Sequence, residues 1–154
     1  TGATSLPEGE YTMWNDSLNI TLGNTEINQT QITGLSQTLN TNTGHFAISG
    51  TSGVTILQTG AYYIECGFQF ELSPGYSQSN GGFFKLVATT NTNIYYSFAR
   101  SRIENTNSHY GSTKLYFGGI IGGNTTLTVY GFKINTNNVI TVTSGNIFVS
   151  RITP

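Results

Sequence analysis

A strict alternation of apolar and polar side chains runs from Ala61 to Leu72. One set of positions is apolar, and the other set includes the glutamates Glu65 and Glu71. A period of two predicts a β-strand with one face in the core and the other in solvent. A shift of one residue would bury both carboxylates, so the pairing of this strand is well specified. The apolar set is Tyr62, Ile64, Cys66, Phe68 and Phe70.

Short apolar runs, rich in Tyr, Phe, Ile, Val and Thr, recur along the rest of the chain. Leu18–Leu22 alternates in the same way, and no stretch of twelve residues shows a convincing helical period. Such spacing predicts an all-β sandwich or barrel of antiparallel strands. We expect residues 1–16 to be a linker or the end of a stalk, and residues 17–154 to form one domain. The turn clusters that separate the runs lie at residues 50–53, 73–82, 91–93, 105–111, 118–124, 135–138 and 144–145.

Two later runs, Ile94–Ile103 and Leu127–Ile134, carry apolar side chains on both faces. A sandwich buries only one face of each sheet, so the second face needs a cover of its own. An interface between subunits is the favoured explanation, and a loop folded over the sheet is the alternative. The residues that we expect at this interface are aromatic: Tyr62, Phe68, Phe70, Tyr96, Phe98, Tyr130 and Phe132.

Charge is scarce in this chain. Only 8% of its 154 residues are charged, against about 25% in an average protein, and the net charge is −1. This balance gives no basic surface for nucleic acid. No apolar run approaches the length of a membrane span, so we expect no membrane insertion. The one cysteine, Cys66, lies on an apolar strand face and is expected to be a buried hydrophobic residue.

The sequence shows none of the common catalytic motifs. It lacks Gly-x-Ser-x-Gly, a Walker loop, His-Glu-x-x-His and Cys-x-x-Cys. Glu65 and Glu71 are six residues apart on one strand, which places them about 20 Å apart. Glycosidase carboxylates lie only about 5–9.5 Å apart. His45 and His109 have no neighbours that would complete a triad or a metal site. We therefore expect no enzyme activity, no metal and no cofactor.

The polar loops are better suited to ligand binding than to catalysis. Tyrosine supplies rigid contact area, and amides and hydroxyls supply hydrogen bonds to a glycan or receptor. Arg100 and Arg102 share a strand face and could grip a carboxylate such as that of sialic acid. The alternatives are solvated hairpins for the loops, and for the arginines an ion pair with Glu104 or a place at an interface. The other candidates are Tyr76, Gln78 and Asn80 in one loop, and His109 and Tyr110 in another.

Four segments together resemble the C1q/TNF-like superfamily, over roughly residues 43–153. Thr43-Gly44-His45-Phe46 is similar to the family's Thr-Gly-x-Phe, and Val54–Ile64 to its strand, turn and Gly-x-Tyr element. Gly123–Tyr130 and Ser144–Ile152 resemble the family's Gly-Asp strand segment and its closing strand. The resemblance implies a jelly-roll β-sandwich of about ten antiparallel strands that forms a compact homotrimer. Asn124 stands where the family has an acidic residue, and no calcium-binding carboxylates are evident.

A shorter segment, Thr12-Met13-Trp14-Asn15, resembles the Thr-Leu-Trp-Thr element between the shaft and the head of adenovirus fibres. This implies a trimeric C-terminal head on a viral or phage fibre, exposed on the virion or outside the cell. Its function would be attachment to a host cell-surface glycan or protein receptor. One alternative is a trimerisation cap of a collagen-like bacterial surface protein that binds no ligand. Another is a glycan esterase or hydrolase, which would need carboxyl groups brought together across strands.

Overall fold

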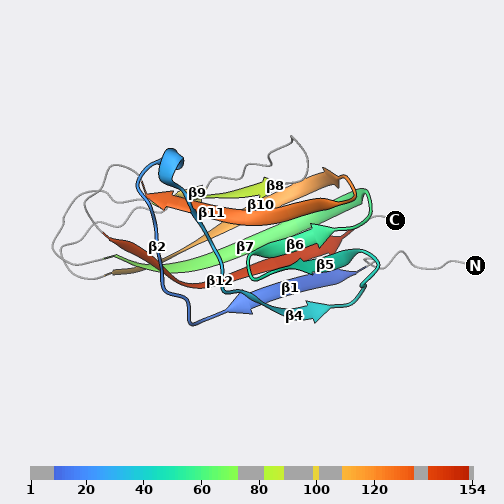
Figure 1. The fold of residues 1–154 in the computed structure, drawn as a ribbon, viewed down its shortest axis with the longest axis horizontal. Coiled ribbons are helices and arrows are strands. Elements are labelled where there is room, and N and C mark those ends of the chain that lie inside the picture. The colour runs from blue at the N-terminus through green and yellow to red at the C-terminus, as the bar shows by residue number, and fades with distance from the viewer. Residues whose placement is uncertain (1–8, 73–81, 89–98, 101–108, 134–138, 153–154) are drawn as a thin grey trace, which may run out of the picture.

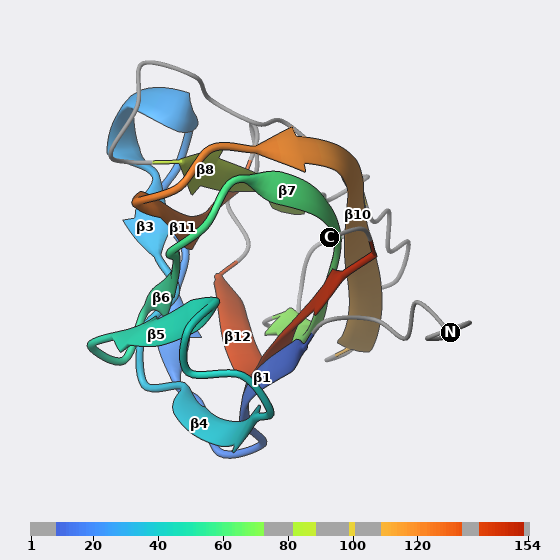
Figure 2. The same cartoon turned by 90° about the vertical axis from the view of Figure 1, so that its right-hand side faces the viewer.

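The fold, described here from a computed structural model, is all-β. The structure describes residues 9–72, 82–88, 99–100, 109–133 and 139–152. In this part of the chain, two antiparallel sheets pack face to face (Figures 1 and 2), and the only helix is the single 3₁₀ turn η1 (Glu26–Asn28). The prediction of an all-β jelly roll is confirmed.

Sheet A has the strand order β10-β7-β12-β1-β4, and β2 also pairs with β12. Sheet B has the order β5-β6-β11-β8-β9, and β3 also pairs with β11. The strands of sheet A are β1 (Glu10–Asn15), β2 (Ile20–Thr21), β4 (Ser36–Asn40), β7 (Gly60–Leu72), β10 (His109–Ile121) and β12 (Ile140–Arg151). Those of sheet B are β3 (Thr30–Gln31), β5 (Phe46–Ser49), β6 (Gly53–Ile56), β8 (Gly82–Ala88), β9 (Ala99–Arg100) and β11 (Thr125–Lys133).

Strand β7 is an inner strand of sheet A, between β10 and β12, and follows the predicted alternation. Its five apolar positions are buried, whereas Glu65 and Glu71 lie on the other face and are partly exposed. β7 pairs along its full length with β10 on one side, and from Tyr62 to Leu72 with β12 on the other. The sequence therefore identified both the strand and its buried face.

The boundary expected at residue 16 is wrong. β1 (Glu10–Asn15) pairs with β12 on one side and with β4 on the other, which places it inside sheet A. Tyr11 and Met13 from this strand are fully buried in the core. Their burial draws the segment into the domain, so the domain includes residues that were expected to belong to a linker.

Two predicted turn clusters are parts of strands. Residues 118–121 belong to β10, and Ser144–Gly145 lies within β12, beside a register shift. A Cβ on Gly145 would lie 3.0 Å from the ring of Phe68, so this glycine permits close packing rather than a turn. Glycine within a strand often marks a bulge or a close approach of this kind.

The interface role expected for three aromatic residues is also wrong. Tyr62, Phe68 and Phe70 are at most 2% exposed and belong to the core of the subunit itself. Large rings are needed to fill the space of about 10 Å between two packed sheets, so these three side chains have no surface left for another subunit.

The interface role of the other four aromatic residues stays a prediction. Phe132 is 5% exposed and lies on the face of β11 opposite to the core residue Val129. Tyr130 is half-buried, and Tyr96 and Phe98 lie outside the described residues.

The hydroxyl of Tyr11 has no hydrogen-bond partner in the described part of the chain, although the side chain is fully buried. Burial raises the pKa of Tyr11 to about 12. We expect Tyr11→Phe to raise the free energy of unfolding by up to about 1 kcal/mol, because a buried hydroxyl without a partner carries a desolvation cost. Chemical denaturation measures the change.

The same variant should alter the alkaline limit of stability. A raised pKa means that the folded state favours the protonated phenol, so stability is complete below pH 10 and falls as the pH rises toward 12. Tyr11→Phe should remove the part of this loss that is due to Tyr11, up to about 2–3 kcal/mol. An identical stability loss in both proteins between pH 10 and 12 would show that Tyr11 ionises as freely in the folded state as in the unfolded one.

Candidate functional site

The two ends of the sandwich carry different parts of the chain. At one end, which we call the terminus end, β1 begins and β12 ends, with Glu10 paired to Ser150. At the other end, which we call the loop end, Leu72 pairs with both His109 and Ile140. Gly82 pairs with Lys133 at the same end of sheet B. The strand ends at Leu72, Gly82 and His109 therefore lie at the loop end (Figure 1). Residues 73–81 and 101–108 lie outside the described residues.

The sequence-predicted ligand residues that the structure describes all lie toward the loop end. Arg100 is in β9, paired with Phe83, and His109 and Tyr110 begin β10 opposite Leu72 and Glu71. β9 and β10 contact each other although they belong to different sheets. The other candidates, Tyr76, Gln78, Asn80 and Arg102, lie outside the described residues. The backbone thus places three of the candidates in one region, and their shared binding role stays a prediction.

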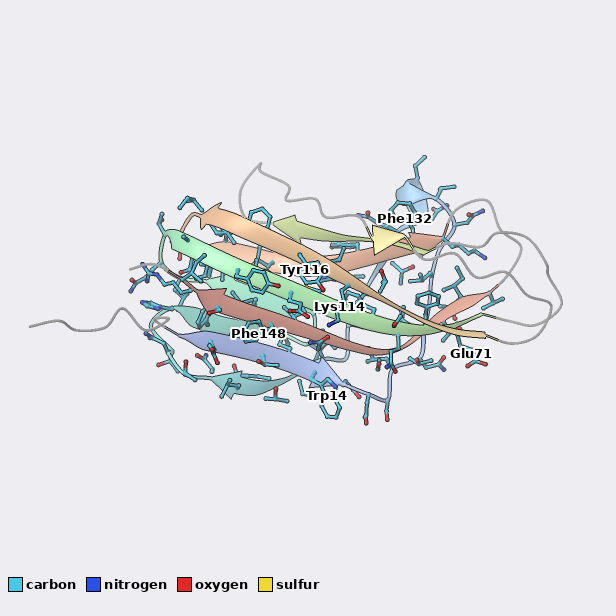
Figure 3. The ribbon with its side chains drawn as sticks, turned by 180° about the vertical axis from the view of Figure 1, so that it is seen from behind. Trp14, Glu71, Lys114, Tyr116, Phe132 and Phe148 are labelled. Atoms are coloured by element: carbon cyan, nitrogen blue, oxygen red, sulfur yellow. The ribbon has the colours of Figure 1, made fainter. Side chains whose placement is uncertain are left out.

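The outer face of sheet A is a second candidate site. It is the face directed away from sheet B, and its residues form rows across the strands. One row is Tyr116, Glu65, Phe148, Thr12 and Leu39, from β10, β7, β12, β1 and β4. The next row toward the loop end is Lys114, Gly67, Asn146, Trp14 and Ser36. Figure 3 shows Tyr116, Lys114, Phe148 and Trp14 spread over this face.

Large apolar side chains are exposed on this face. Tyr116 is 52% exposed, Ile120 66%, Trp14 47% and Leu39 41%. Phe148 lies between them and is half-buried. Such side chains on one open sheet face are typical of a surface that another protein covers.

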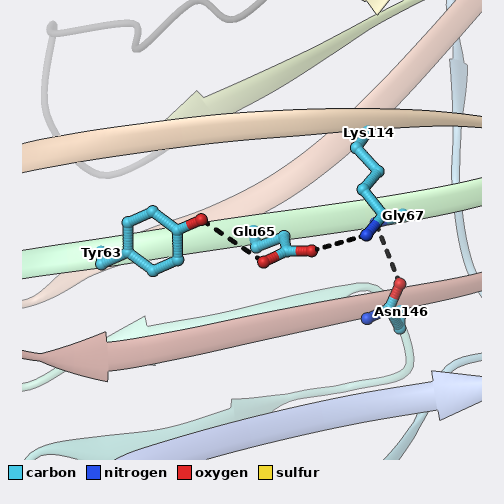
Figure 4. Close-up of polar contacts among 5 residues, drawn as sticks. All are labelled: Tyr63, Glu65, Gly67, Lys114 and Asn146. Carbon is cyan, nitrogen blue, oxygen red and sulfur yellow. Dashed lines mark hydrogen bonds and ion pairs between the residues drawn. The ribbon is translucent and has the colours of Figure 1, made fainter.

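The centre of the same face holds a polar network (Figure 4). Lys114 Nζ lies 3.1 Å from Glu65 Oε1, and the Tyr63 hydroxyl donates to Glu65 Oε2 at 3.3 Å. The hydrogen bond and charge of Glu65 raise the pKa of Lys114. Burial, and then the charge of Glu65, raise the pKa of Tyr63. Lys114 and Glu65 therefore neutralise each other, which leaves the centre of the face with little net charge.

Gly67 opens a hollow in this face. Asn146 Oδ1 accepts a hydrogen bond from the Gly67 backbone N–H at 2.9 Å, and a Cβ on Gly67 would lie 2.6 Å from the same oxygen. Beside them is a space of about 360 Å³, bordered by Trp14, Lys114 and Asn146. The missing side chain at Gly67 thus lets Asn146 fold across the strand and leaves room for a group from a partner.

The terminus end is held by a buried arginine that the sequence analysis did not identify. Arg151 Nη1 lies 2.7 Å from His45 Nε2, and Nη2 donates to the Thr59 carbonyl at 3.1 Å. Both Arg151 and His45 are buried. A Cβ on Gly60 would lie 2.7 Å from the guanidinium. The group joins β12 to the start of β5 and to the loop before β7, which indicates a structural role for His45.

The described residues offer little for catalysis. They contain no group of three or more His, Cys, Asp or Glu side chains that could hold a metal ion. Cys66 is fully buried, and burial raises the pKa of its thiol, which disfavours the reactive thiolate. In the part of the chain that was searched, no helix is long and apolar enough to cross a membrane.

The sequence analysis missed Trp14, Tyr116, Ile120, Leu39 and Phe148 as surface residues. A usable signal was present, since Trp14 follows the buried Met13, and Tyr116 follows the buried Leu115. In a strand, neighbours point to opposite faces, so a large apolar side chain next to a core residue must lie on the outer face. The pairing of β10, β7, β12 and β1, which gathers these residues on one face, is not visible in the sequence.

Comparisons with known proteins agree with this fold. No protein-family model and no curated protein matches the sequence. Among solved structures, Eiger TNF from S. frugiperda is similar with a TM-score of 0.67 and 10% identity, over 95% of this chain and 93% of that one. The globular domain of zebrafish complement 1qA is similar with a TM-score of 0.61 and 11% identity, over 94% and 96%. Murine APRIL at pH 5.0 has a TM-score of 0.55 and 12% identity, over 92% and 98%. The fold is therefore a C1q/TNF-like jelly roll, as the sequence resemblance implied.

Proposed function

We propose that this domain is the homotrimeric head of a viral or phage fibre that attaches to a glycan or protein receptor on the host cell surface. One observation carries the proposal: the outer face of sheet A exposes Tyr116, Ile120, Trp14 and Leu39 in an isolated subunit. Aromatic and aliphatic side chains of this size are enriched where subunits meet. The shared fold with Eiger TNF and complement 1qA supports the same architecture.

The face is large enough to hold subunits together. Its five strands are about 4.8 Å apart, and β7 and β10 each have 13 residues at about 3.3 Å per residue. β12 has 12 residues, β1 has six and β4 has five, so the five strands together cover about 800 Å² of sheet. This equals the area that each partner contributes to a standard stable interface.

The placement of the termini supports the role of a head. Strand β1 begins and β12 ends at the terminus end (Figure 1). A stalk joined to the N-terminal side would leave the loop end, where the backbone of Arg100, His109 and Tyr110 lies, on the side away from the stalk. Three copies of a weak site on one rigid head increase the avidity for a surface that carries many receptors. This arrangement supports an extracellular or virion-surface location.

Light scattering tests the assembly, and a glycan array tests the attachment. We expect a mass of about 50 kDa, three times 16.6 kDa, and binding that decreases in an Arg100→Ala, Arg102→Ala variant. The control is Lys133→Ala, which removes another cation at the loop end and should leave binding unchanged. Arg151→Ala is not a suitable control, because Arg151 is buried at the terminus end. A mass of 16.6 kDa at all concentrations would contradict the trimer. A stable trimer that binds neither glycans nor host cells would instead support the role of a trimerisation cap.

A further inference from the structure

A lysine, a glutamate and an asparagine meet on three neighbouring strands at the centre of the outer face of sheet A. Lys114 is on β10, Glu65 on β7 and Asn146 on β12. Lys114 and Asn146 are both paired with Gly67 of β7, so they lie in one row with only a glycine between them. A primary amine, a carboxyl group and a primary amide are the groups that an amide crosslink between lysine and asparagine requires.

Gly67 lets the lysine and the asparagine approach each other across β7. A Cβ at this position would lie 3.7 Å from Asn146 Cγ and 4.0 Å from Lys114 Cγ, so both side chains lean over the same point of the strand. Figure 4 shows them directed toward Gly67 from β12 and β10. Three bonds separate Lys114 Cγ from Nζ, so a change of rotamer can carry the nitrogen from Glu65 toward Asn146 Cγ.

The asparagine and the glutamate are both held in place by hydrogen bonds. Asn146 Oδ1 accepts from the Gly67 backbone N–H at 2.9 Å, and this donor would stabilise the negative charge that develops on Oδ1 when an amine attacks Cγ. Glu65 Oε2 accepts from the Tyr63 hydroxyl at 3.3 Å, while Oε1 lies 3.1 Å from Lys114 Nζ. The carboxylate is therefore placed to accept a proton from the lysine.

Solvent opposes such a reaction in an isolated subunit. The Lys114 and Glu65 side chains are 59% and 29% exposed there, and water stabilises the ammonium form, which has no lone pair for attack. A partner that covers this face would exclude the water. A dry site favours transfer of the proton from Lys114 to Glu65, which leaves a neutral amine. This step rests on the proposed trimer.

We propose that, in the assembled protein, Lys114 and Asn146 join in an amide crosslink that ties β10 to β12 across β7. Glu65 takes a proton from the Lys114 ammonium, and the neutral Nζ attacks Asn146 Cγ. As the Nζ–Cγ bond forms and the Cγ–Nδ2 bond breaks, a proton passes from Nζ to Nδ2 through Glu65, and ammonia leaves. The ammonia takes the proton that Glu65 still holds, so the carboxylate is restored and no oxidant or further reactant is consumed.

Mass spectrometry of the denatured protein tests the crosslink. The unmodified protein should be lighter than its sequence mass by about 17 Da, the mass of the ammonia that is lost. Trypsin should not cleave after Lys114, because the amine is acylated. Residues 103–133 should stay joined to residues 134–151, which contain Asn146. A loss of ammonia elsewhere in the chain would not join these two peptides.

Matched variants test the role of each group. Lys114→Arg keeps a cation beside Glu65 but replaces the amine by a guanidinium, and Glu65→Gln keeps the shape of the side chain but removes the proton acceptor. We expect no crosslink in the first variant and crosslinking at least about tenfold slower in the second. Lys133→Arg, the same change on β11 of sheet B, should crosslink as the unmodified protein does. Circular dichroism shows that each variant is folded. A crosslink in Lys114→Arg, or an unchanged rate in Glu65→Gln, would contradict these roles.

Light scattering of the same samples separates this inference from the proposed function. A trimer whose subunits keep their full sequence mass overturns the crosslink alone. A monomer of full mass overturns the trimer, and with it the covered face that the reaction needs. A monomer that lacks the mass of one ammonia, with the two peptides joined, overturns the trimer but supports the crosslink.

Discussion

Phe68→Ala is expected to lower the free energy of unfolding by about 3–5 kcal/mol, the cost of emptying a large core site. Phe68 is only 2% exposed, and its ring packs against the backbone of β12, where a Cβ on Gly145 would lie 3.0 Å away. The neighbouring strand cannot move in to fill the gap without breaking its pairing with β7. Urea denaturation of Phe68→Ala and of the unmodified protein, at one protein concentration, measures the change in the free energy of unfolding.

Tyr116→Ala is the comparison for this experiment. Both changes remove an aromatic ring from sheet A, but Tyr116 is half-exposed on the outer face. It should weaken the trimer and change the stability of the isolated subunit by less than about 1 kcal/mol. If Phe68→Ala instead dissociated the trimer and left the subunit equally stable, Phe68 would be an interface residue after all.

The contrast between Phe68 and Tyr116 explains what the sequence could predict. Alternation along β7 depends only on residues that are close in sequence, so the strand and its buried face were predictable. Whether a buried ring faces the other sheet or another subunit depends on what lies opposite. The prediction of an interface rests on two later runs that carry apolar side chains on both faces, and it extends the same role to the rings of β7. In this structure, Tyr62, Phe68 and Phe70 fill that core.

The surface site depends on pairings between distant segments. Trp14 lies beside Asn146 because β1 pairs with β12, and Lys114 lies two strands further along because β7 and β10 follow in the sheet. These residues are up to 132 positions apart in the chain, as Trp14 and Asn146 show. Local patterns carry no information on such pairing, so a single sequence could not identify this face. The resemblance to the C1q/TNF-like fold supplied the architecture, but not the residues exposed on it.

The fold separates three regions of the domain. The core holds the two sheets together, the terminus end is fixed by Arg151 and His45, and the outer face of sheet A exposes large apolar side chains. A change on the outer face therefore need not disturb the core.

Gly53→Ala is expected to be as damaging as the loss of a core ring, for a different reason. A Cβ at Gly53 would lie only 2.0 Å from the carbonyl oxygen of Leu127, a distance that real Cβ atoms essentially never show. Because the obstacle is the backbone of β11, no side-chain rotation can relieve it. β6 must move away from β11, which opens the core at Val54, Ile56 and Leu127. We expect the free energy of unfolding, measured by urea denaturation, to fall by about 3 kcal/mol or more, within the range for severe packing defects.

Gly118→Ala is the matched control for this prediction, because a Cβ at Gly118 would meet no atom within 4 Å. Gly118 also lies within a strand, so both changes gain the same benefit of about 0.5–1 kcal/mol from replacing glycine by alanine. Gly118→Ala should therefore be as stable as the unmodified subunit, or slightly more stable. Equal stability of the two alanine variants would mean that β6 and β11 do not approach as closely as the pairing of Val54 with Leu127 requires. The contact between β6 and β11, which joins the two halves of sheet B, would then differ from the one in this structure.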